Sequence, residues 1–334
     1  MKIFDAHVHC FNAPSNIKIL CETADKMGFD IINILSAPPY GGISQNIQAL
    51  FCKAYNPSRI YCFGGLEYET GRDFLEQAKI LTNCGVDGFK SIEGKPTIRK
   101  KLNIALDDPL YDPFYSFLEE QGLPILMHIA DPIEFWDISK MPQWTIDAGW
   151  HYDKSFVSFL QLQNEVENLL KKHPRLKLIL AHFYFLSHDI KKAEYMFETY
   201  PNIYFDITAG TEMYVNFSKN INVWREFFVK YQNRIIFGTD STDSSDLEEI
   251  KNKYVINNME LKFLNANGEI EAWDLKIKGL GLGQDVINKI LWDNANNLIK
   301  QKKLNISAVL DEIDYLIDFK KDISLLEIKN ILQK

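Results

Sequence analysis

The sequence contains no apolar run that approaches the ~20 residues of a membrane-spanning helix. No basic stretch followed by an apolar core precedes its first strand-like segment, so a secretory signal is not expected. The five cysteines are an odd number, and none of them forms a C-x-x-C pair, so a disulfide framework is not expected either. These absences predict a cytoplasmic protein with reduced thiols and no membrane partner.

The sequence also has fewer basic than acidic residues. The 37 lysines and arginines are outnumbered by 45 aspartates and glutamates, which gives a formal net charge of −8. A surface of this sign does not favour nucleic acid or an anionic membrane as the partner. A chain of 334 residues can bury an extensive core. We therefore expect a soluble protein whose main partner is a small-molecule substrate.

Short apolar runs alternate with longer amphipathic stretches through most of the chain. Eight runs have the composition of buried parallel strands. They cover residues 3–9, 29–36, 60–66, 86–92, 123–129, 176–183, 203–208 and 234–240. Each is followed by a helical segment, which is the pattern of an α/β protein with a (β/α)8 TIM barrel fold. Residues 1–303 are expected to form this barrel.

Two additions to the barrel are predicted near the carboxyl end. The turn residues 265–268 (NANG) lie between the apolar segments 261–264 and 269–273, which predicts a small hairpin inserted after the eighth strand. Residues 304–334 carry two apolar stripes at helical spacing, which predicts a C-terminal extension of two amphipathic helices. This extension is expected to pack on the barrel or on a second subunit, and a homodimer is the oligomer that we expect.

The first predicted strand carries two histidines separated by one residue. Side chains alternate between the two faces of a strand, so Asp5, His7 and His9 are expected to share one face. Two neighbouring imidazoles on one face provide half of the ligand shell of a divalent metal such as zinc, iron or manganese. The remaining ligands have to come from other strands.

Active groups of parallel barrels lie at the carboxyl ends of the strands. The histidines, lysine and aspartate at such predicted ends are His7, His9, Lys90, His128, His182 and Asp240. Neutral imidazoles would leave a bound metal its positive charge and an open position, where a water can ionise near pH ~7. Asp240 either completes the metal shell or takes the water proton, and His182 can polarise or protonate a substrate oxygen.

The sequence resembles the second family of the amidohydrolase superfamily, which includes aminocarboxymuconate semialdehyde decarboxylase, aromatic-acid decarboxylases and lactone hydrolases. The resemblance covers residues 1–300 and rests on DAHVH (5–9), ILMH (125–128), ILAH (179–182), PNIYFDIT (201–208), FGTDS (237–241) and ILWDNANNLI (290–299). It implies one divalent metal, zinc in the first place, with manganese or iron as alternatives. By position it implies that the metal ligands are His7, His9, His128 and Asp240, and that His182 is the nearby acid or base.

One departure from the family follows the strand-six histidine, where glycines are usual and Phe183, Tyr184 and Phe185 stand instead. This departure affects the expected shape of the substrate pocket. The long loop at residues 130–153 contains three tryptophans, which either wall off an apolar substrate or pack in an interface. The residues expected to bind substrate are Lys90, Trp136, Trp144 and Tyr184.

Lys90 allows three interpretations from the sequence. It can bind a substrate carboxylate, it can be carboxylated and bridge two metals, or it can form an ion pair with Glu93. We favour the first of these.

The leading functional hypothesis is a metal-dependent hydrolase acting on a small carboxylate-bearing amide or lactone. The alternative is a non-oxidative decarboxylase of an aromatic or muconate-type acid that uses the same metal, with His182 as the proton donor. A two-metal phosphodiesterase or nuclease would need a bridging ligand and, for nucleic acid, a basic surface that the sequence lacks. A non-enzymatic barrel would be expected to have lost metal ligands, and none is missing.

Overall fold

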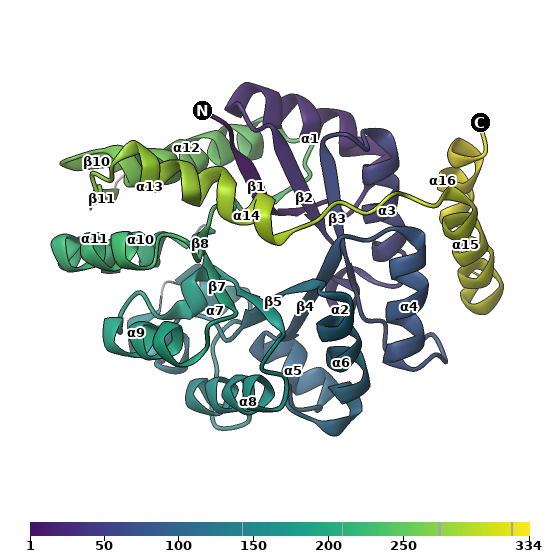
Figure 1. Cartoon of the computed structure of the whole chain (residues 1–334), viewed down its shortest axis with the longest axis horizontal. Helices are drawn as coiled ribbons and strands as arrows, with labels where there is room; N and C mark the ends of the chain where they lie inside the picture. The colour runs from purple at the N-terminus through teal and green to yellow at the C-terminus, as the bar shows by residue number, and fades with distance from the viewer. Residues whose placement is uncertain (142, 209, 273–274, 322) are drawn as a thin grey trace.

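The computed structural model describes residues 1–141, 143–208, 210–272, 275–321 and 323–334, and within them all side chains except that of Trp144. Parallel strands lie at the centre of the molecule and helices surround them (Figure 1). The strands of the main sheet are β1 (Phe4–His9), β2 (Ile31–Leu35), β3 (Ile60–Gly65), β4 (Gly88–Gly94), β5 (Pro124–Ile129), β6 (Lys177–Leu180), β7 (Ile203–Asp206), β8 (Ile235–Ile236) and β9 (Ser241–Thr242).

The helices that follow the first five strands are α1 (Ala13–Met27), α2 (Pro38–Gly41), α3 (Gln45–Tyr55), α4 (Phe74–Cys84), α5 (Pro96–Leu102), α6 (Asp112–Gln121), α7 (Gln143–Asp147) and α8 (Phe159–Lys172). Those in the rest of the chain are α9 (Ile190–Thr199), α10 (Thr211–Lys219), α11 (Ile221–Lys230), α12 (Leu247–Asn265), α13 (Gln284–Asn288), α14 (Asn294–Leu298), α15 (Ile306–Lys320) and α16 (Leu325–Leu332). None of the helices in the described ranges is long and apolar enough to cross a bilayer.

The main sheet has the strand order β8-β7-β6-β5-β4-β3-β2-β1-β9, and its neighbouring strands are parallel. β8 and β9 are parts of one segment, which pairs with β7 at one end and with β1 at the other. Between them, the Ala6 amide donates to the Phe237 carbonyl over 3.1 Å. This segment closes the sheet, so the predicted TIM barrel is confirmed. The predicted eighth strand is interrupted, because the Phe237 amide donates to the Ile290 carbonyl instead of to a strand.

Two apolar layers stabilise the barrel. The larger fills the space between the strands and the surrounding helices. The smaller lies inside the barrel and is called the barrel floor below; its members are Phe4, Ala6, Leu35, Phe63, Leu126, Ile179, Ala181, Ile236, Ala295, Leu298 and Ile299. Full burial of each large side chain in it contributes about 1.5–3 kcal/mol. The floor, which includes residues of α14, fills the amino-terminal end of the barrel. Polar side chains converge at the opposite end, where the strands have their carboxyl ends, and this end is called the mouth below.

β1 departs from the expected alternation of side chains. Phe4 and Ala6 belong to the floor, and yet His7 also points inward, because the pairing of β1 with β2 shifts register within this strand. Asp5 alternates with Phe4 and Ala6 and so lies on the opposite face, where it accepts hydrogen bonds from the Thr239 amide (3.0 Å) and hydroxyl (2.7 Å). The prediction that Asp5 shares a face with the histidines is therefore wrong.

The hairpin insertion is present, but its strands are not the predicted pair. β10 (Glu269–Ala272) pairs with β11 (Leu275–Lys278) in antiparallel register, and residues 273–274 between them lie outside the described residues. The segment 261–264, expected as the first strand, is the end of α12, where Phe263 and Leu264 are buried. A short apolar run has the same appearance in a buried helix and in a strand, which explains the error.

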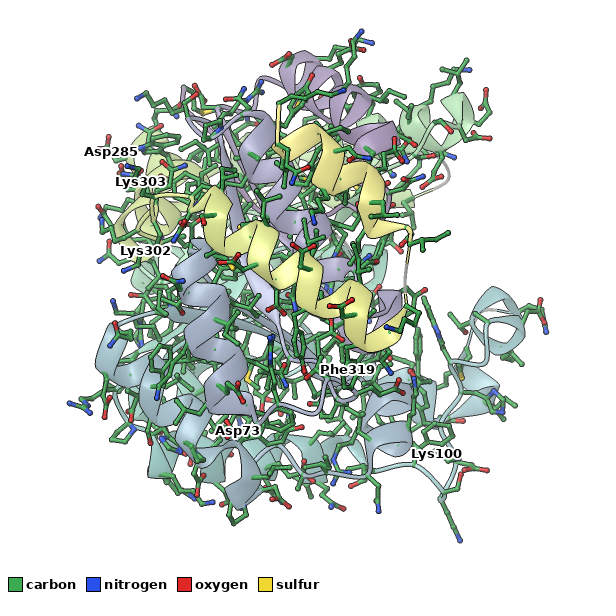
Figure 2. All side chains as sticks on the ribbon, turned by 90° about the vertical axis from the view of Figure 1, so that its right-hand side faces the viewer. Asp73, Lys100, Asp285, Lys302, Lys303 and Phe319 are labelled. Carbon is green, nitrogen blue, oxygen red and sulfur yellow. The ribbon has the colours of Figure 1, made fainter. Side chains whose placement is uncertain are left out.

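The two predicted C-terminal helices are confirmed as α15 and α16, which lie together against α3 and α4 (Figure 2). Val309, Ile313 and Leu316 are the buried apolar face of α15. The Glu312 carboxylate accepts two hydrogen bonds from Arg72 Nη1, at 2.8 and 2.6 Å, which ties the extension to the start of α4. Whether residues 304–334 also contact a second subunit stays a prediction.

Candidate metal centre

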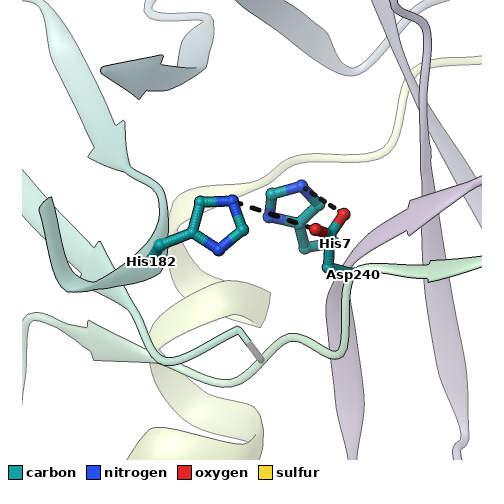
Figure 3. Close-up of side chains that lie close together, drawn as sticks. All are labelled: His7, His182 and Asp240. Atoms are coloured by element: carbon teal, nitrogen blue, oxygen red, sulfur yellow. Dashed lines mark ion pairs between the residues drawn. The ribbon is translucent and has the colours of Figure 1, made fainter. Parts of the chain in front are cut away.

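Six polar side chains predicted from strand ends form one connected cluster at the mouth of the barrel. His7 Nε2 lies 3.2 Å and His9 Nε2 3.4 Å from Asp240 Oδ1. Lys90 Nζ lies 3.1 Å from His7 Nε2. On the other side, His182 Nε2 lies 3.1 Å from His128 Nδ1 and 3.9 Å from Asp240 Oδ2. Figure 3 shows His182 facing His7 and Asp240 across the centre of this cluster.

The two histidines of β1 have their outer nitrogens fixed by acceptors. His7 Nδ1 lies 2.9 Å from Asp206 Oδ2, and His9 Nδ1 lies 3.0 Å from the Leu35 carbonyl. A carboxylate and a carbonyl only accept, so each imidazole carries its proton on Nδ1. Their Nε2 atoms therefore direct lone pairs into the cluster, the arrangement that a metal-binding histidine requires.

His182 is oriented in a similar way by Asp206 of β7 and by Thr208, which follows this strand. Thr208 Oγ1 donates to Asp206 Oδ1 at 2.7 Å, so the hydroxyl has no second proton and accepts from His182 Nδ1 at 2.9 Å. The Asp206 Oδ1 atom also accepts the His182 amide at 2.7 Å. The Nε2 atom of His182 is therefore unprotonated and also carries a lone pair.

His128 is oriented the other way round. Its Nε2 lies 3.1 Å from Asp131 Oδ1 and donates to it, so its Nδ1 carries the lone pair. This lone pair faces the lone pair of His182 Nε2 at only 3.1 Å. Two acceptors at this distance repel each other unless a cation or a proton lies between them.

The spacing of the acceptor atoms fits a divalent metal. Ligand bonds of about 2.0–2.2 Å place neighbouring atoms of an octahedral or tetrahedral shell roughly 3.0–3.4 Å apart. The contacts between His128 and His182 and between Asp240 and the two β1 histidines fall in this range. Within the described residues, ligand atoms of His7, His182 and Asp240 all lie within 4.8 Å of one another.

Burial sets the charge of the cluster. It lowers the pKa of His9 to about 3 and also lowers the pKa values of His7, His128 and His182, because desolvation disfavours the imidazolium form. The imidazoles are thus neutral ligands at physiological pH. Burial also raises the pKa of the Asp240 carboxyl to about 6.

Lys90 is the buried cation beside these acceptors. Burial lowers the pKa of its amine to about 8, against the raising influence of Asp240 and Asp206. The ion pair with Glu93 considered from the sequence is not found; Glu93 Oε1 instead accepts the Tyr68 hydroxyl at 2.9 Å. Among the described residues Lys90 forms no ion pair within 4.0 Å, which leaves its charge available to a ligand.

The backbone at the mouth is strained. His182, Phe183, Tyr184 and Phe185 have φ values of 54°, 55°, 56° and 51°, which form a left-handed turn. Such a conformation costs roughly 1–2 kcal/mol for each non-glycine residue. Glycine would adopt this conformation without strain, but histidine and three aromatic residues occupy these positions. The Phe183 ring is fully buried among five other aromatic rings of the outer layer, which offsets this cost.

The predicted aromatic substrate residues do not touch the cluster in the described part of the chain. Tyr184 is buried in the outer layer, with its ring 6.0 Å from that of Phe205. Trp136 packs 4.8 Å from Tyr152 and donates from Nε1 to the Val157 carbonyl. The side chain of Trp144 lies outside the described residues. The contribution of these three residues to substrate binding stays a prediction.

Two aspartates that orient the histidines were not predicted from the sequence. Asp206 lies in the motif PNIYFDIT, at the inward-facing position two residues after Tyr204. A carboxylate at the buried end of a strand is a signal from which its role could have been predicted. Asp131 follows His128 by three residues and gives no comparable signal in the sequence. Both act through the outer nitrogen of a histidine.

A parallel barrel that gathers imidazoles and a carboxylate at its mouth is typical of metal-dependent enzymes. A family model described as amidohydrolase matches residues 78–300, which is more than half of the chain. The chain belongs to the amidohydrolase family, so the resemblance inferred from the motifs is confirmed. A comparison with curated protein sequences gives no match.

Several solved structures share the fold. A protein described as a probable 2-pyrone-4,6-dicarboxylic acid hydrolase from Acinetobacter baumannii is 13% identical, with a TM-score of 0.54 over 89% of this chain and 99% of that one. The 5-carboxyvanillate decarboxylase of Sphingomonas paucimobilis is 12% identical, with a TM-score of 0.53 over 90% and 99%. A dihydroxybenzoic acid decarboxylase from a Polaromonas species, with bound manganese, is 15% identical, with a TM-score of 0.50 over 89% and 96%.

Proposed function

We propose that the protein is a metal-dependent hydrolase in which a metal-activated water attacks a small carboxylate-bearing lactone or amide. The observation that carries the proposal is the approach of ligand atoms of His7, His182 and Asp240 to within 4.8 Å of one another, with His9 next to Asp240 and His128 next to His182. Lys90 offers its positive charge to His7 Nε2, but the facing lone pairs of His128 and His182 are electrostatically unfavourable until a cation lies between them. The amidohydrolase family and a fold neighbour named as a hydrolase of a dicarboxylic acid support this choice.

His7, His9, His128 and Asp240 would hold one divalent metal, zinc in the first place, with manganese or iron as alternatives. One fold neighbour carries manganese. A metal bound by these residues would supply a water that ionises near neutral pH. The Nε2 of His182 points to the same space, so His182 can contact either the metal or the substrate.

The protein side chains have separable tasks in this proposal. The Asp240 side chain is 34% exposed and lies between the histidines and solvent, so it can take up a proton and release it to water. His182 can donate a proton to the leaving oxygen or nitrogen once its Nε2 has gained one. Lys90 would hold the substrate carboxylate as a buried point charge.

The second candidate is non-oxidative decarboxylation of an aromatic acid, and one contact favours it. The Phe185 ring stacks on the His182 imidazole, with centroids 5.2 Å apart and planes at 30°, and it lies 5.5 Å from His128. Phe185 thus places an aromatic surface beside the predicted proton donor. A substrate ring could lie against this surface while His182 protonates the carbon that loses carbon dioxide.

Product analysis tests the two candidates. The purified metal-loaded protein is incubated with lactones, amides and hydroxybenzoates that carry a carboxylate, and acid release and carbon dioxide release are followed separately. Acid release without carbon dioxide supports the hydrolase, and the converse supports the decarboxylase. Metal analysis of the same protein is expected to give one equivalent per chain. A protein that binds no divalent metal would refute both.

Three other expectations stay predictions. They are a cytoplasmic location, the lack of a nucleic acid partner, and a homodimer formed through residues 304–334. Exposed apolar side chains do lie on this extension, at Phe319, Ile323, Leu326 and Ile331. Sedimentation velocity of the wild type beside Leu326→Glu distinguishes a dimer through this surface from a monomer.

A further inference from the structure

A buried carboxylate links the metal-ligand histidine of β5 to the aromatic segment that follows it. Asp131 Oδ1 accepts from His128 Nε2 at 3.1 Å and from Lys95 Nζ at 3.0 Å. Its Oδ2 atom accepts from Lys95 Nζ at 3.0 Å and from the Tyr152 hydroxyl. Asp131 is only 4% exposed, so these contacts are shielded from water and from salt.

Asp131 decides which nitrogen of His128 faces the other acceptors. The two ring nitrogens of His128 contact Asp131 and His182 respectively, and its ring packs beside Phe185. If the carboxylate were removed, nothing in the contacts described for His128 would hold the proton on Nε2 or prevent the ring from turning over. The lone pair on Nδ1 would then be lost to the site for part of the time.

The segment of residues 133–141 and 143–157 contacts this carboxylate directly and also contacts its partner Lys95. Tyr152 reaches Asp131 through its hydroxyl, and Trp150 lies over Lys95, whose Nζ is 4.4 Å from the ring centroid. Tyr152 also organises the segment itself: its amide donates to the Phe135 carbonyl at 2.8 Å, and its ring contacts Trp136 and Phe156 at 4.8 and 5.0 Å.

We propose that Asp131 is a positioning residue that makes the orientation of His128 depend on the docking of the segment that carries Tyr152, residues 133–141 and 143–157, against the Asp131 carboxylate. This inference rests on the proposed function for the role of His128 as a metal ligand. Because coupling between two equilibria is reciprocal, metal binding stabilises the docked segment by the same factor by which docking strengthens metal binding. The segment is then held against Asp131 more tightly when the site is loaded.

Metal affinity is the first measurement. Zinc dissociation constants are determined by competition with a chromogenic chelator for the wild type, Asp131→Ala, Asp131→Asn and Tyr152→Phe. Loss of a carboxylate behind a metal-binding histidine weakens binding by about 10–100-fold, and this is the range expected for Asp131→Ala. Asp131→Asn should recover part of the affinity, because its amide oxygen can still accept from His128 Nε2. Asp147→Asn, an exposed aspartate of the same segment, is the control and should bind like the wild type.

The orientation of His128 is read directly in the metal-free protein. Long-range 1H–15N spectra of histidine-labelled protein, assigned with His128→Gln, should show His128 protonated on Nε2 in the wild type and in Asp131→Asn. A mixture of tautomers is expected in Asp131→Ala. A merely structural role of Asp131 would leave this signature unchanged.

The docking of the segment is read from tryptophan fluorescence and limited proteolysis with and without zinc. Zinc should protect the segment in the wild type and protect it much less in Tyr152→Phe. The inference is overturned if Asp131→Ala binds zinc within twofold of the wild type, or if it keeps a single Nε2-protonated His128. A wild type that binds no metal would refute the proposed function instead, while the tautomer spectra would still decide whether Asp131 orients His128. If Asp131→Ala fails to fold, Asp131→Asn and Tyr152→Phe provide the same comparisons.

Discussion

The floor of the barrel and its mouth differ in chemistry and in backbone conformation. The floor is built from apolar side chains of the strands and of α14. At the mouth, acceptor atoms face one another, and the backbone is left-handed at Ala130, at residues 182–185 and at Asp240. In the described residues, the other non-glycine positions with positive φ are Asn103 and Lys321, which end α5 and α15. The floor thus contributes the stability that allows the mouth to retain strain and unbalanced polar atoms.

The largest effect is expected from removal of one acceptor at the mouth. His7→Ala should reduce bound metal from one equivalent to nearly none, and Asp240→Asn should lower kcat by about 10²–10⁴-fold, because it removes both a charge and a proton acceptor. Asp240→Asn should not lower the melting temperature of the metal-free protein much. His151→Ala, in the loop at residues 150–153, is the control. Full metal content in His7→Ala, measured by elemental analysis, would contradict the assignment.

A cavity in the floor should lower the stability of the protein but leave metal binding nearly unchanged. Phe63 is fully buried in β3, and Phe63→Ala is expected to lower the free energy of unfolding by about 3–5 kcal/mol. Urea denaturation of the metal-free protein measures this loss. Zinc affinity of the folded fraction should remain within a few-fold of the wild type, because the ligand atoms lie above the floor. A large loss of zinc affinity together with little loss of stability would show that the two regions are not separable.

The parts of the structure that could be predicted are those with a local signature. Apolar runs ended by turn residues located the strands, and the rule that barrel active groups lie at strand ends placed His7, His182 and Asp240 together. The register shift in β1 has no local signature, because it depends on pairing with β2. The hydrogen bond between His7 and Asp206 joins residues 199 positions apart, so only the closed barrel brings them into contact.

The pH dependence of stability should come from buried acids outside the floor, because the floor contains no acid or base. Glu67, directly after β3, is buried, and burial with the nearby Glu312 and Glu69 raises its pKa from 4.5 to about 8. An acid with a raised folded-state pKa binds its proton more tightly in the folded protein, so it destabilises the fold as pH rises from 4.5 to about 8. Glu67→Gln should remove this loss, on the order of 3 kcal/mol at pH 8 relative to pH 5.

Urea titrations of the metal-free wild type and Glu67→Gln at both pH values measure the difference. Glu248→Gln is the control, because the Glu248 side chain is 78% exposed and pairs with Lys251 at the surface. Parallel pH profiles for Glu67→Gln and the wild type would show that Glu67 does not titrate in this way.

The smallest effect is expected from backbone strain, which is present at the mouth and absent at the floor. Ala130 and Ala181 are both 1% exposed, but Ala130 has a φ of 68°, whereas Ala181, a floor residue, has a φ of −64°. Substitution by glycine removes one buried methyl group and adds the same chain freedom at both sites, but it relieves left-handed strain only at Ala130. Ala130→Gly should therefore be less destabilising than Ala181→Gly by about 1–2 kcal/mol in urea denaturation. Equal losses at the two sites would mean that the turn after β5 stores no strain, and that the contrast between floor and mouth is one of side-chain chemistry alone.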